Sequence, residues 1–547
     1  MRQVFRKLDY TKRRNFTHNS IMKALISDKM DPRCVEILEK NSAVQVDVKT
    51  DLSPDELESI IGGYTALIVR SSTQVTESVL RAGRQLKVVG RAGIGVDNID
   101  VEAATRCGVV VMNTPGGNSV SAAEFSFAML MGLARNIPQA AASLRAGQWE
   151  RGRFTGVELT GKTLGVLGLG KVGREVALRG AAFKMRVLGY DLILSEEVAL
   201  SSGAQMATLE EIYDQADFIS VHIPLTPQTR HMLSEAQFAR CKNELYLVNC
   251  ARGGIVDEEA LLRALDAGQV AGAALDVFEE EPPTSPALTG HDRVICTPHL
   301  GASTAEAQAS VALQIAEQVG DVLLDRVIRN AINVPSVEPE VYQKIRPFLE
   351  LAENMGRILA QLGEGQLKRI TIEYHGDVTV YPTSPLTAAV LKGIMETVSE
   401  EAVNFVNAAY FAQERGIHVD ELRSSEHENF ASLITVIYQT SQGSRTLGGT
   451  LFGKSEARLV RLDEYLFDAV PEHHMLFYVN DDVPGIIGRI GTLMGKHQVN
   501  IAQMSCGRHE VGSRALTIIN VDSEIPDAVL EEVTSQENII WAKKINL

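Results

Sequence analysis

A glycine motif near the middle of the chain constrains the fold more than any other feature. The run Thr163–Leu167 has the apolar pattern of a buried strand, and Gly168, Gly170 and Gly173 follow it at Gly-x-Gly-x-x-Gly spacing. Residues 174–184 then continue with the apolar spacing of a helix. A strand that turns sharply into a helix in this way is typical of a βαβ unit, and it predicts a parallel sheet in an α/β fold.

Short apolar runs alternate with helical patterns on both sides of this motif. Such runs are typical of parallel strands that are joined by helices. They fall into two series, so we predict two Rossmann-like lobes, the first flavodoxin-like, with a ligand-binding cleft between them. The expected strands are Lys23–Ser27, Val44–Val48, Ala66–Ser71, Lys87–Gly90 and Val109–Asn113 in the first lobe, and Thr163–Leu167, Arg186–Tyr190, Phe218–His222, Tyr246–Asn249, Ala271–Asp276 and Val294–Thr297 in the second.

A longer helical pattern separates the two series of strands. It runs from about Ser119 to Arg135, and Ser121 with Glu124 three residues later has the spacing of a capping box. We therefore predict that a long helix joins the lobes and that these two side chains mark its start.

The composition changes near Asn333-Val334-Pro335, which indicates a domain boundary. Beyond it, the helical stretches Phe348–Leu362 and Leu386–Arg415 give way to alternating patterns, which predicts an α+β domain. From His473 the order strand–helix–strand–strand–helix–strand predicts a ferredoxin-like unit. The expected divisions are a basic extension at 1–21, a substrate domain at 22–115 and 301–334, a nucleotide-binding domain at 116–300, an intervening regulatory domain at 335–470 and the terminal unit at 473–547.

The overall composition excludes several classes of partner. The formal net charge of −16 argues against nucleic acid, and no run of about 18 apolar residues is present to span a membrane. The six cysteines are scattered without a Cys-x-x-Cys pair, which favours free thiols in a reducing compartment, hence the cytoplasm. His473-His474 lacks a third ligand at a recognisable spacing, so no metal site is expected.

The first twenty residues differ from the rest because they are strongly basic. Met1–Ser20 contains six arginines and lysines against the single acid Asp9. An Arg-rich segment that is poor in acids is compatible with an organellar targeting peptide, but the apolar core of a secretory signal is missing. A disordered tail, or a start codon upstream of a true start at Met22, is the favoured interpretation.

The glycine motif predicts a dinucleotide site. Gly168 permits the tight turn, Gly170 lets a pyrophosphate approach the backbone, and Gly173 allows close packing of helix on strand. Asp191 ends the next expected strand, 18 residues beyond Gly173, where a carboxylate can bind both ribose hydroxyls. The same carboxylate repels the extra 2′-phosphate of NADP, so the expected cofactor is NAD.

Three candidate catalytic side chains each lie shortly after one of the last three expected strands of the second lobe. They are Arg252, Glu281 and His299. Hydride transfer involving a 2-hydroxy acid needs a cation for the carboxylate, a proton donor and acceptor for the C2 oxygen, and a neighbour that tunes this group. An arginine, a histidine and a carboxylate at strand ends provide these three functions.

The three motifs around these residues resemble those of the D-isomer-specific 2-hydroxyacid dehydrogenase family. They are Asn249–Gly254, Leu275–Pro283 and Thr297–Gly301. The resemblance implies that Arg252 binds the substrate carboxylate and polarises the carbonyl. It makes His299 the general acid and base, and Glu281, five residues after Asp276, the partner that favours the protonated imidazole.

The same resemblance implies further contacts with the dinucleotide. Ile94 and Ile223 fall where members of the family often carry a hydroxyl near the cofactor, so the hydrogen bonds there are in doubt. His222 is expected near the nicotinamide ribose but not in catalysis. Besides the three glycines, Asp191 and the two isoleucines, the implied cofactor residues are Lys171, Val172, Cys250, Ala251, Arg252, Asp276, His299, Gly301 and Ala302.

Arginines at the ends of two strands of the first lobe narrow the substrate. Arg70 and Arg91 match positions that hold the phosphoglycerate anion in one branch of the family, and Asn118 and Arg151 match further substrate contacts. Guanidinium groups suit phosphate and carboxylate oxygens. Ion pairing of Arg70 and Arg91 within the lobe is the structural alternative.

The terminal unit resembles an ACT domain, a module that senses amino acids. The stretch Val479–Gly488 and the segment Val499-Asn500-Ile501 carry the resemblance, which implies that Asp482 and Asn500 bind L-serine as an effector. We expect the terminal unit alone to leave two strand edges and an apolar sheet face uncovered. Pairing with a second copy would cover them, so we predict a homo-oligomer, specifically a tetramer.

Together these features predict NAD-dependent oxidation of 3-phospho-D-glycerate to 3-phosphohydroxypyruvate, the first step of L-serine biosynthesis. Two alternatives stay open at this point. One is a relative that acts on glyoxylate, hydroxypyruvate or 2-hydroxyglutarate, although it would not need Arg70, Arg91 and an ACT unit together. The other is an NAD-sensing scaffold, although it would not need Arg252, Glu281 and His299.

Overall fold

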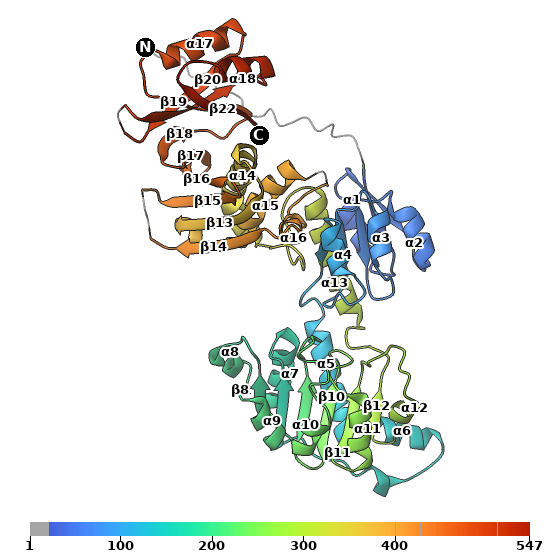
Figure 1. The fold of residues 1–547 in the computed structure, drawn as a ribbon. Helices are drawn as coiled ribbons and strands as arrows, with labels where there is room; N and C mark the ends of the chain where they lie inside the picture. Colours follow the sequence, from blue (N-terminus) through green and yellow to red (C-terminus); the bar gives the residue numbers. More distant parts are fainter. Residues whose placement is uncertain (1–20, 400, 427–428, 511) are drawn as a thin grey trace, which may run out of the picture. The chain divides into compact units, whose positions relative to one another are not determined.

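The computed structural model describes residues 21–399, 401–426, 429–510 and 512–547, so the basic segment Met1–Ser20 lies outside the described residues. The chain forms two compact units (Figure 1). Unit 1 contains the residues up to 91, residues 95–113 and residues 315–547, and unit 2 contains residues 92–94 and 114–314. The chain therefore passes between the units four times, once within the long helix α13 (Ala305–Leu323).

Unit 1 begins with a five-stranded parallel sheet of order β2-β1-β3-β4-β5, which confirms the flavodoxin-like prediction. Gly90 in β4 allows α13 to approach the sheet, because a Cβ there would lie 2.7 Å from Val319 and 2.8 Å from Ile315. The strands are β1 (Met22–Ile26), β2 (Val44–Val48), β3 (Ala66–Val69), β4 (Val88–Arg91) and β5 (Val110–Met112), and the helices are α1 (Arg33–Glu39), α2 (Pro54–Ile61), α3 (Glu77–Ala82) and α4 (Val101–Arg106).

Unit 2 contains a seven-stranded parallel sheet of order β12-β11-β10-β9-β6-β7-β8, the doubly wound topology of a dinucleotide-binding fold. The two-residue strand β8 was not predicted, because so short a run has no apolar pattern. The strands are β6 (Thr163–Leu167), β7 (Arg186–Tyr190), β8 (Gln205–Met206), β9 (Phe218–Val221), β10 (Leu245–Asn249), β11 (Val270–Leu275) and β12 (Val294–Cys296), and the helices are α5 (Ser119–Ala134), α6 (Ile137–Arg145), α7 (Lys171–Ala182), α8 (Glu196–Ser201), α9 (Leu209–Gln215), α10 (Glu235–Arg240), α11 (Glu258–Asp266) and α12 (Pro286–Thr289), with the 3-10 helix η1 (Arg151–Phe154).

Helix α5 exists as predicted, but the predicted capping box is wrong. The helix begins at Ser119 after Asn118, so Ser121 and Glu124 already lie inside it. The Ser121 hydroxyl instead bonds the Thr304 hydroxyl at 2.8 Å, and Glu124 pairs with Arg179. Both side chains that the local pattern assigned to the start of the helix, Ser121 and Glu124, therefore bind residues distant in the sequence.

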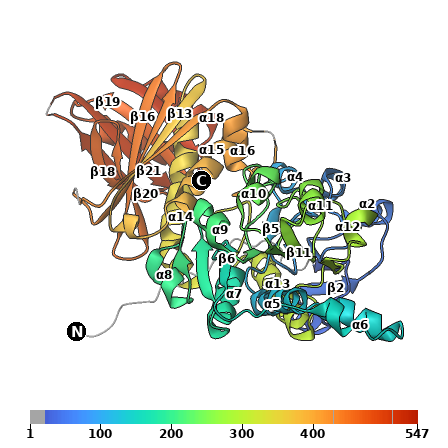
Figure 2. The same cartoon turned by 90° about the horizontal axis from the view of Figure 1, so that it is seen from below.

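The intervening part of unit 1 is a six-stranded mixed sheet with helices on one face (Figures 1 and 2). The prediction of one helix over Leu386–Arg415 is wrong, because the structure has two separate helices there, α15 and α16. Asn404 and Asn407 lie in the break, where Asn404 Oδ1 accepts from the N–H of Val406 at 2.8 Å, and such local bonds compete with the helix. The helices are α14 (Pro339–Leu362), α15 (Ser384–Val398), α16 (Ala408–Glu414) and the 3-10 turn η2 (Asp377–Val380), and the strands are β13 (Leu367–Gly376), β14 (His418–Ser424), β15 (Ser432–Thr440), β16 (Gly443–Phe452), β17 (Glu456–Leu462) and β18 (Tyr465–Ala469).

The C-terminal part has the predicted ferredoxin-like order, with an antiparallel sheet β20-β21-β19-β22. One face of the sheet packs on the two helices, where Leu476 and Tyr478 lie buried with Ile490 and Val529. The elements are β19 (His474–Asp481), α17 (Ile486–Lys496), β20 (Ile501–Arg508), β21 (Arg514–Val521), α18 (Asp527–Thr534) and β22 (Ile539–Asn546).

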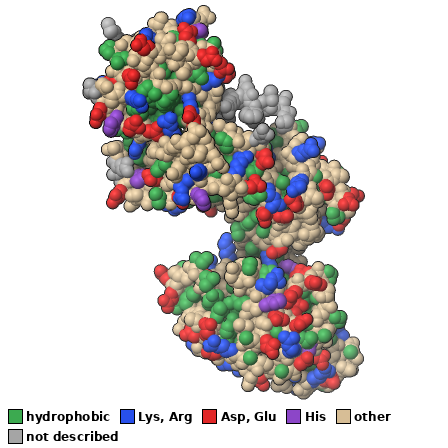
Figure 3. Space-filling view, viewed as in Figure 1, with side chains coloured by type: hydrophobic (Ala, Val, Ile, Leu, Met, Phe, Trp, Pro, Cys, Tyr) green, Lys and Arg blue, Asp and Glu red, His purple; other side chains and the backbone are tan. Residues whose placement is uncertain are grey.

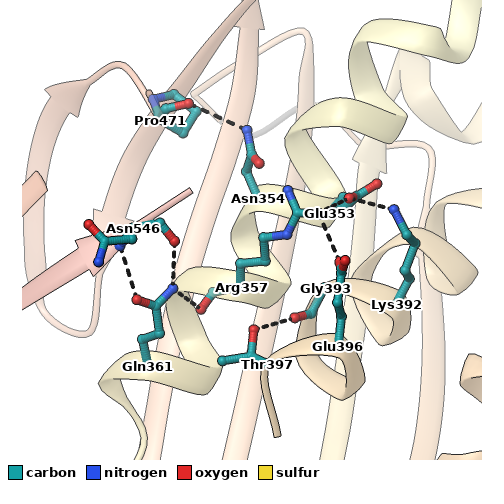
Figure 4. A network of polar contacts seen from close by, with 10 residues as sticks. All are labelled: Glu353, Asn354, Arg357, Gln361, Lys392, Gly393, Glu396, Thr397, Pro471 and Asn546. Carbon is teal, nitrogen blue, oxygen red and sulfur yellow. Dashed lines mark hydrogen bonds and ion pairs between the residues drawn. The ribbon is translucent and has the colours of Figure 1, made fainter. Parts of the chain in front are cut away.

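The other face of this sheet is not open, so the predicted uncovered apolar face is wrong. Six of its side chains belong to the same buried core as α14, α15 and the mixed sheet, and they are Met475, Phe477, Val479, Leu516, Ile518 and Ile545. Polar contacts reinforce this joint (Figure 4): Gln361 of α14 makes two 3.0 Å bonds with the backbone of Asn546, and Asn354 donates to the carbonyl of Pro471. The intervening and C-terminal parts therefore share one core.

The surface charge and the length and polarity of the helices bear on the expected classes of partner. Acidic and basic side chains are interspersed on the face drawn in Figure 3. Within the described residues, every helix is too short or too polar to cross a membrane.

Candidate active site

The turn from β6 into α7 has open space where a pyrophosphate would lie. Gly168 has φ +94°, and a Cβ there would lie 2.6 Å from the carbonyl oxygen of His222. A Cβ on Gly173 would lie 1.8 Å from the carbonyl oxygen of Gly168, so this position also requires glycine. At Gly170, the N-cap residue of α7, no atom of the described residues lies within 4 Å of a Cβ. The turn therefore fits a dinucleotide phosphate at the helix N-terminus.

Asp191 follows β7 beside this turn. Its Oδ2 accepts from the N–H of Leu169 at 2.9 Å, and its Oδ1 accepts from the N–H groups of Ile193 and Leu194 at 2.9 and 3.1 Å. Burial acts to raise the pKa of Asp191, but these backbone donors outweigh it, and the pKa is lowered. The carboxylate is thus held ionised against the glycine turn, where it suits ribose hydroxyls and disfavours a 2′-phosphate.

Three other residues that were predicted near the cofactor, Lys171, His222 and Ile223, lie beside the same turn, and Cys250 follows β10. Lys171 Nζ donates to the carbonyl of Pro115 at 2.8 Å, and Ile223 packs against Gly168. Burial raises the pKa of the Cys250 thiol to about 12, so it stays a neutral, apolar lining group. Desolvation of the half-buried His222 lowers its pKa to about 4, and its Nε2 bonds the Ser220 hydroxyl at 2.8 Å.

The three predicted catalytic residues follow three neighbouring strands of the unit 2 sheet. Arg252 comes after β10, Glu281 after β11 and His299 after β12, and these strands are adjacent in the order β12-β11-β10. His299 Nδ1 and Glu281 Oε2 are 2.8 Å apart, and both side chains are about half exposed. Because Glu281 occupies Nδ1, Nε2 is the ring nitrogen that can exchange a proton with a substrate.

Two buried residues set the positions of these catalytic groups, and we had not predicted this role for either. Asp276 is fully buried, and its oxygens accept from the N–H groups of Leu300 and Gly301, both at 2.8 Å. It therefore fixes the loop that carries His299. Asn249 accepts from Ala251 N at 3.1 Å and donates to the carbonyl of Arg252 at 2.9 Å. Polar residues at the ends of apolar strands were the only sequence signal for these turns.

The remaining predicted substrate residues lie in both units. In unit 1, Arg91 ends β4 and pairs in register with Val69, and Arg70 follows β3 directly. In unit 2, Asn118 Oδ1 is buried and has no hydrogen-bond partner among the described residues. Arg151 lies exposed at the start of η1.

The two predicted effector residues lie just after β19 and just before β20, two strands of the C-terminal sheet that β21 separates. Asp482 follows β19 and accepts from Arg508 Nη1 at 3.0 Å and from Gly512 N at 3.3 Å. Asn500 precedes β20 and donates to Asp522 Oδ2 at 2.5 Å. An effector that binds Asp482 and Asn500 would have to replace these hydrogen bonds or add to them.

Three parts of the chain match models of known protein families. Residues 127–301 match the family model "D-isomer specific 2-hydroxyacid dehydrogenase, NAD binding domain", residues 344–463 match "D-3-phosphoglycerate dehydrogenase intervening domain", and residues 474–538 match "ACT domain". The D-3-phosphoglycerate dehydrogenase of Synechocystis sp. is 44% identical over 98% of this chain and 96% of its own length, and that of Archaeoglobus fulgidus is 41% identical over 96% and 100%. The crystal structure of D-lactate dehydrogenase from Aquifex aeolicus with NAD and lactic acid has a TM-score of 0.51 at 27% identity, over 57% of this chain and 99% of that one.

The fold, the glycine turn and these matches define the class. The chain is an NAD-dependent oxidoreductase that belongs to the D-isomer specific 2-hydroxyacid dehydrogenase family. Within that family it belongs with the D-3-phosphoglycerate dehydrogenases that carry an intervening domain and an ACT domain.

The contacts of Asp191 give a prediction about the choice of cofactor. We expect Asp191→Ala to raise the KM for NAD and to narrow its advantage over NADP, because the repulsive carboxylate is removed. Asp191→Asn is the matched variant, since the amide keeps the size but not the charge. Steady-state kinetics with both cofactors make the comparison. If both variants keep the NAD preference of the parent, another residue recognises the ribose.

Proposed function

We propose that the chain oxidises 3-phospho-D-glycerate to 3-phosphohydroxypyruvate with NAD, which is the first step of L-serine biosynthesis. The observation that carries the proposal is the His299–Glu281 pair at 2.8 Å, on strand ends next to Arg252 and in the same sheet as the dinucleotide turn. The names of the full-length relatives support the choice of substrate.

Each catalytic residue has a distinct part in the reaction. NAD, when it is bound, accepts the hydride that leaves C2 of the substrate. His299 Nε2 takes the proton from the C2 hydroxyl as this happens, and Glu281 at Nδ1 stabilises the imidazolium that forms. Arg252 holds the substrate carboxylate and, in the reverse direction, polarises the C2 carbonyl. Asp276 and Asn249 keep the two loops in place through backbone bonds, so little reorganisation is needed on binding.

The substrate phosphate distinguishes this proposal from the alternatives. Glyoxylate, hydroxypyruvate and 2-hydroxyglutarate lack a phosphate, and an NAD-sensing scaffold would need no acid–base pair. We assign the phosphate to Arg70 and Arg91, with Asn118 and Arg151 as further substrate contacts. Support comes from the placement of the two arginines at the ends of neighbouring strands, β3 and β4.

We expect Arg70→Ala and Arg91→Ala to raise the KM for 3-phosphoglycerate at least ~10-fold more than the KM for D-glycerate, which lacks the phosphate, because hydrogen bonds to charged groups contribute about that much. The control is Arg81→Ala in the same unit, whose guanidinium is exposed and pairs with Glu77 on its own helix. NADH formation measured with both substrates makes the test. Equal losses on the two substrates would mean that Arg70 and Arg91 are structural.

We also propose that the chain forms a homo-oligomer, specifically a tetramer. We propose the cytoplasm as its location. The support is an apolar surface on unit 2: none of the described residues of α6 is buried, and the nearby Trp149 is 77% exposed. Ile137 and Leu144 of α6 are also more than half exposed. Large aromatic and aliphatic side chains on a surface helix are typical of protein interfaces.

The ACT domain supports a proposal about regulation, with L-serine as the effector and Asp482 and Asn500 as its ligands. We expect Asn500→Ala to abolish inhibition by serine and to keep activity in its absence, because Asn500 lies in the C-terminal domain and not in unit 2. Serine titrations of activity, with calorimetric binding, compare the parent and the variant. If the parent binds no serine, the sensor proposal fails and the dehydrogenase assignment stands.

A further inference from the structure

One buried side chain in unit 1, Asn98, joins Arg70 and Arg91. Its Nδ2 donates to the carbonyls of Arg70 and Thr73 at 2.8 and 2.6 Å, and its Oδ1 accepts from Arg91 Nε at 2.8 Å. Asn98 is 8% exposed. Both hydrogen atoms of the amide and its oxygen are therefore used, two on the turn that carries Arg70 and one on the Arg91 side chain.

A second buried residue, Asp28, holds the same turn from the other side. It follows β1, the neighbour of β3 in the sheet, and it is 6% exposed. Its Oδ2 accepts from the N–H groups of Arg70 and Thr73 at 2.5 and 3.3 Å, and its Oδ1 accepts from the Thr73 hydroxyl at 2.9 Å. The turn of residues 70–73 is thus fixed by a carboxylate on one side and an amide on the other.

The bond between Asn98 and Arg91 Nε distinguishes this arrangement from an ordinary turn. A purely structural asparagine would need only the two carbonyls of the turn. The third bond reaches a side chain on the next strand, and fixing Nε fixes the plane of the guanidinium. Binding of an anion by an arginine fork depends on this orientation, and a side chain that is already oriented loses less entropy on binding.

We propose that Asn98 and Asp28 are positioning residues for the substrate phosphate, with Asn98 coupling the turn of Arg70 to the guanidinium of Arg91. The proposal rests on the proposed function, in which these two arginines bind the phosphate. Asn98 and Asp28 act through the arginines and do not themselves touch the substrate.

The test measures kcat/KM for 3-phosphoglycerate relative to D-glycerate in the full-length chain. We expect Asn98→Ala to lower this ratio ~10-fold, mainly through a higher KM for 3-phosphoglycerate, with the kcat and the KM for NAD close to those of the parent. Asn98→Asp leaves no cavity and keeps the acceptor, but it removes two donors and places a negative charge beside Arg91. We expect it to lower the ratio at least as much, so it serves as the second variant if Asn98→Ala does not fold.

Asn333 offers a matched control in the same unit. It also makes three hydrogen bonds to a turn: Nδ2 donates to Thr105 Oγ1 and the carbonyl of Val109, and Oδ1 accepts from Val111 N. We expect Asn333→Ala to lower the thermal unfolding midpoint as Asn98→Ala does and to leave the substrate ratio unchanged. The proposal is overturned if the Asn98 variants keep the parent's ratio of kcat/KM for 3-phosphoglycerate to that for D-glycerate. It is also overturned if Asn333→Ala lowers this ratio as much as Asn98→Ala does.

Arg70→Ala and Arg91→Ala in the same assay separate this proposal from the proposed function. If neither arginine variant changes the ratio, the assignment of the phosphate to these residues fails, and the positioning role fails with it. If the arginine variants lower the ratio and the Asn98 variants do not, only the positioning role is wrong. In the Asn98→Ala/Arg91→Ala double variant, we expect the ratio to fall less than the product of the two single effects, because Asn98 acts partly through Arg91.

Discussion

We expect His299→Ala to lower turnover at least ~10²-fold and to leave the affinity for NAD nearly intact, since general acid–base catalysis typically contributes that much. In the proposed mechanism the imidazole takes the proton from the substrate, whereas the glycine turn and Asp191 are the groups proposed to bind the cofactor elsewhere in the sheet. Steady-state kinetics with 3-phosphoglycerate, together with calorimetric titration of NAD, measure the two quantities separately.

His291→Ala is the control for this substitution. His291 lies before β12, at the opposite end of the strand from His299, where its Nδ1 accepts from Arg293 N at 3.1 Å. We expect turnover close to that of the parent in this variant. Unchanged turnover in His299→Ala would remove His299 from the acid–base role, whatever the result for the control.

We expect removal of the residues after Pro471 to give an aggregated or unfolded chain. The ACT domain is not a detachable module, because six of its apolar side chains lie in the core shared with α14 and α15. Burial of an aliphatic or aromatic side chain contributes about 1.5–3 kcal/mol, so the loss of all six removes roughly 9–18 kcal/mol, comparable with the whole stability of a domain.

Truncation after Pro335 is the matched comparison. It removes the intervening and C-terminal parts together, so no half of their shared core is left exposed on the remaining chain. We expect the shorter chain to stay monodisperse and to bind NAD, as followed by light scattering and calorimetry. A monodisperse, cooperatively melting product from the cut after Pro471 would show that the intervening part does not depend on the ACT sheet.

Most of the fold could be predicted because it depends on local patterns. The runs around Leu167, Tyr190 and Asn249 are short, apolar and bounded by polar residues, so the strands of both parallel sheets, except the two-residue β8, were found within one or two residues. The ferredoxin-like order after His473 was equally clear. The motifs around Arg252, Glu281 and His299 led to the prediction of a catalytic pair, Glu281 and His299, and the structure places these two side chains at hydrogen-bond distance.

The features that were missed depend on partners distant in the sequence. Ser121 has the local signature of a helix cap, but its hydroxyl bonds Thr304, 183 residues away. The apolar face of the C-terminal sheet resembled an open surface because its cover, α14, lies more than a hundred residues earlier in the chain. Asn98 is a single polar residue in a turn after β4, and Asp276 is one at the end of β11, so only the folded backbone shows what they hold.

The central claim is that the site oxidises a phosphorylated 2-hydroxy acid with NAD. The most direct test is NADH formation by the full-length chain with 3-phosphoglycerate, D-glycerate and 2-hydroxyglutarate side by side. We expect the kcat/KM for 3-phosphoglycerate to exceed the other two at least ~10²-fold, because the others lack the phosphate that two arginines would bind. A higher kcat/KM for D-glycerate or 2-hydroxyglutarate would contradict the account.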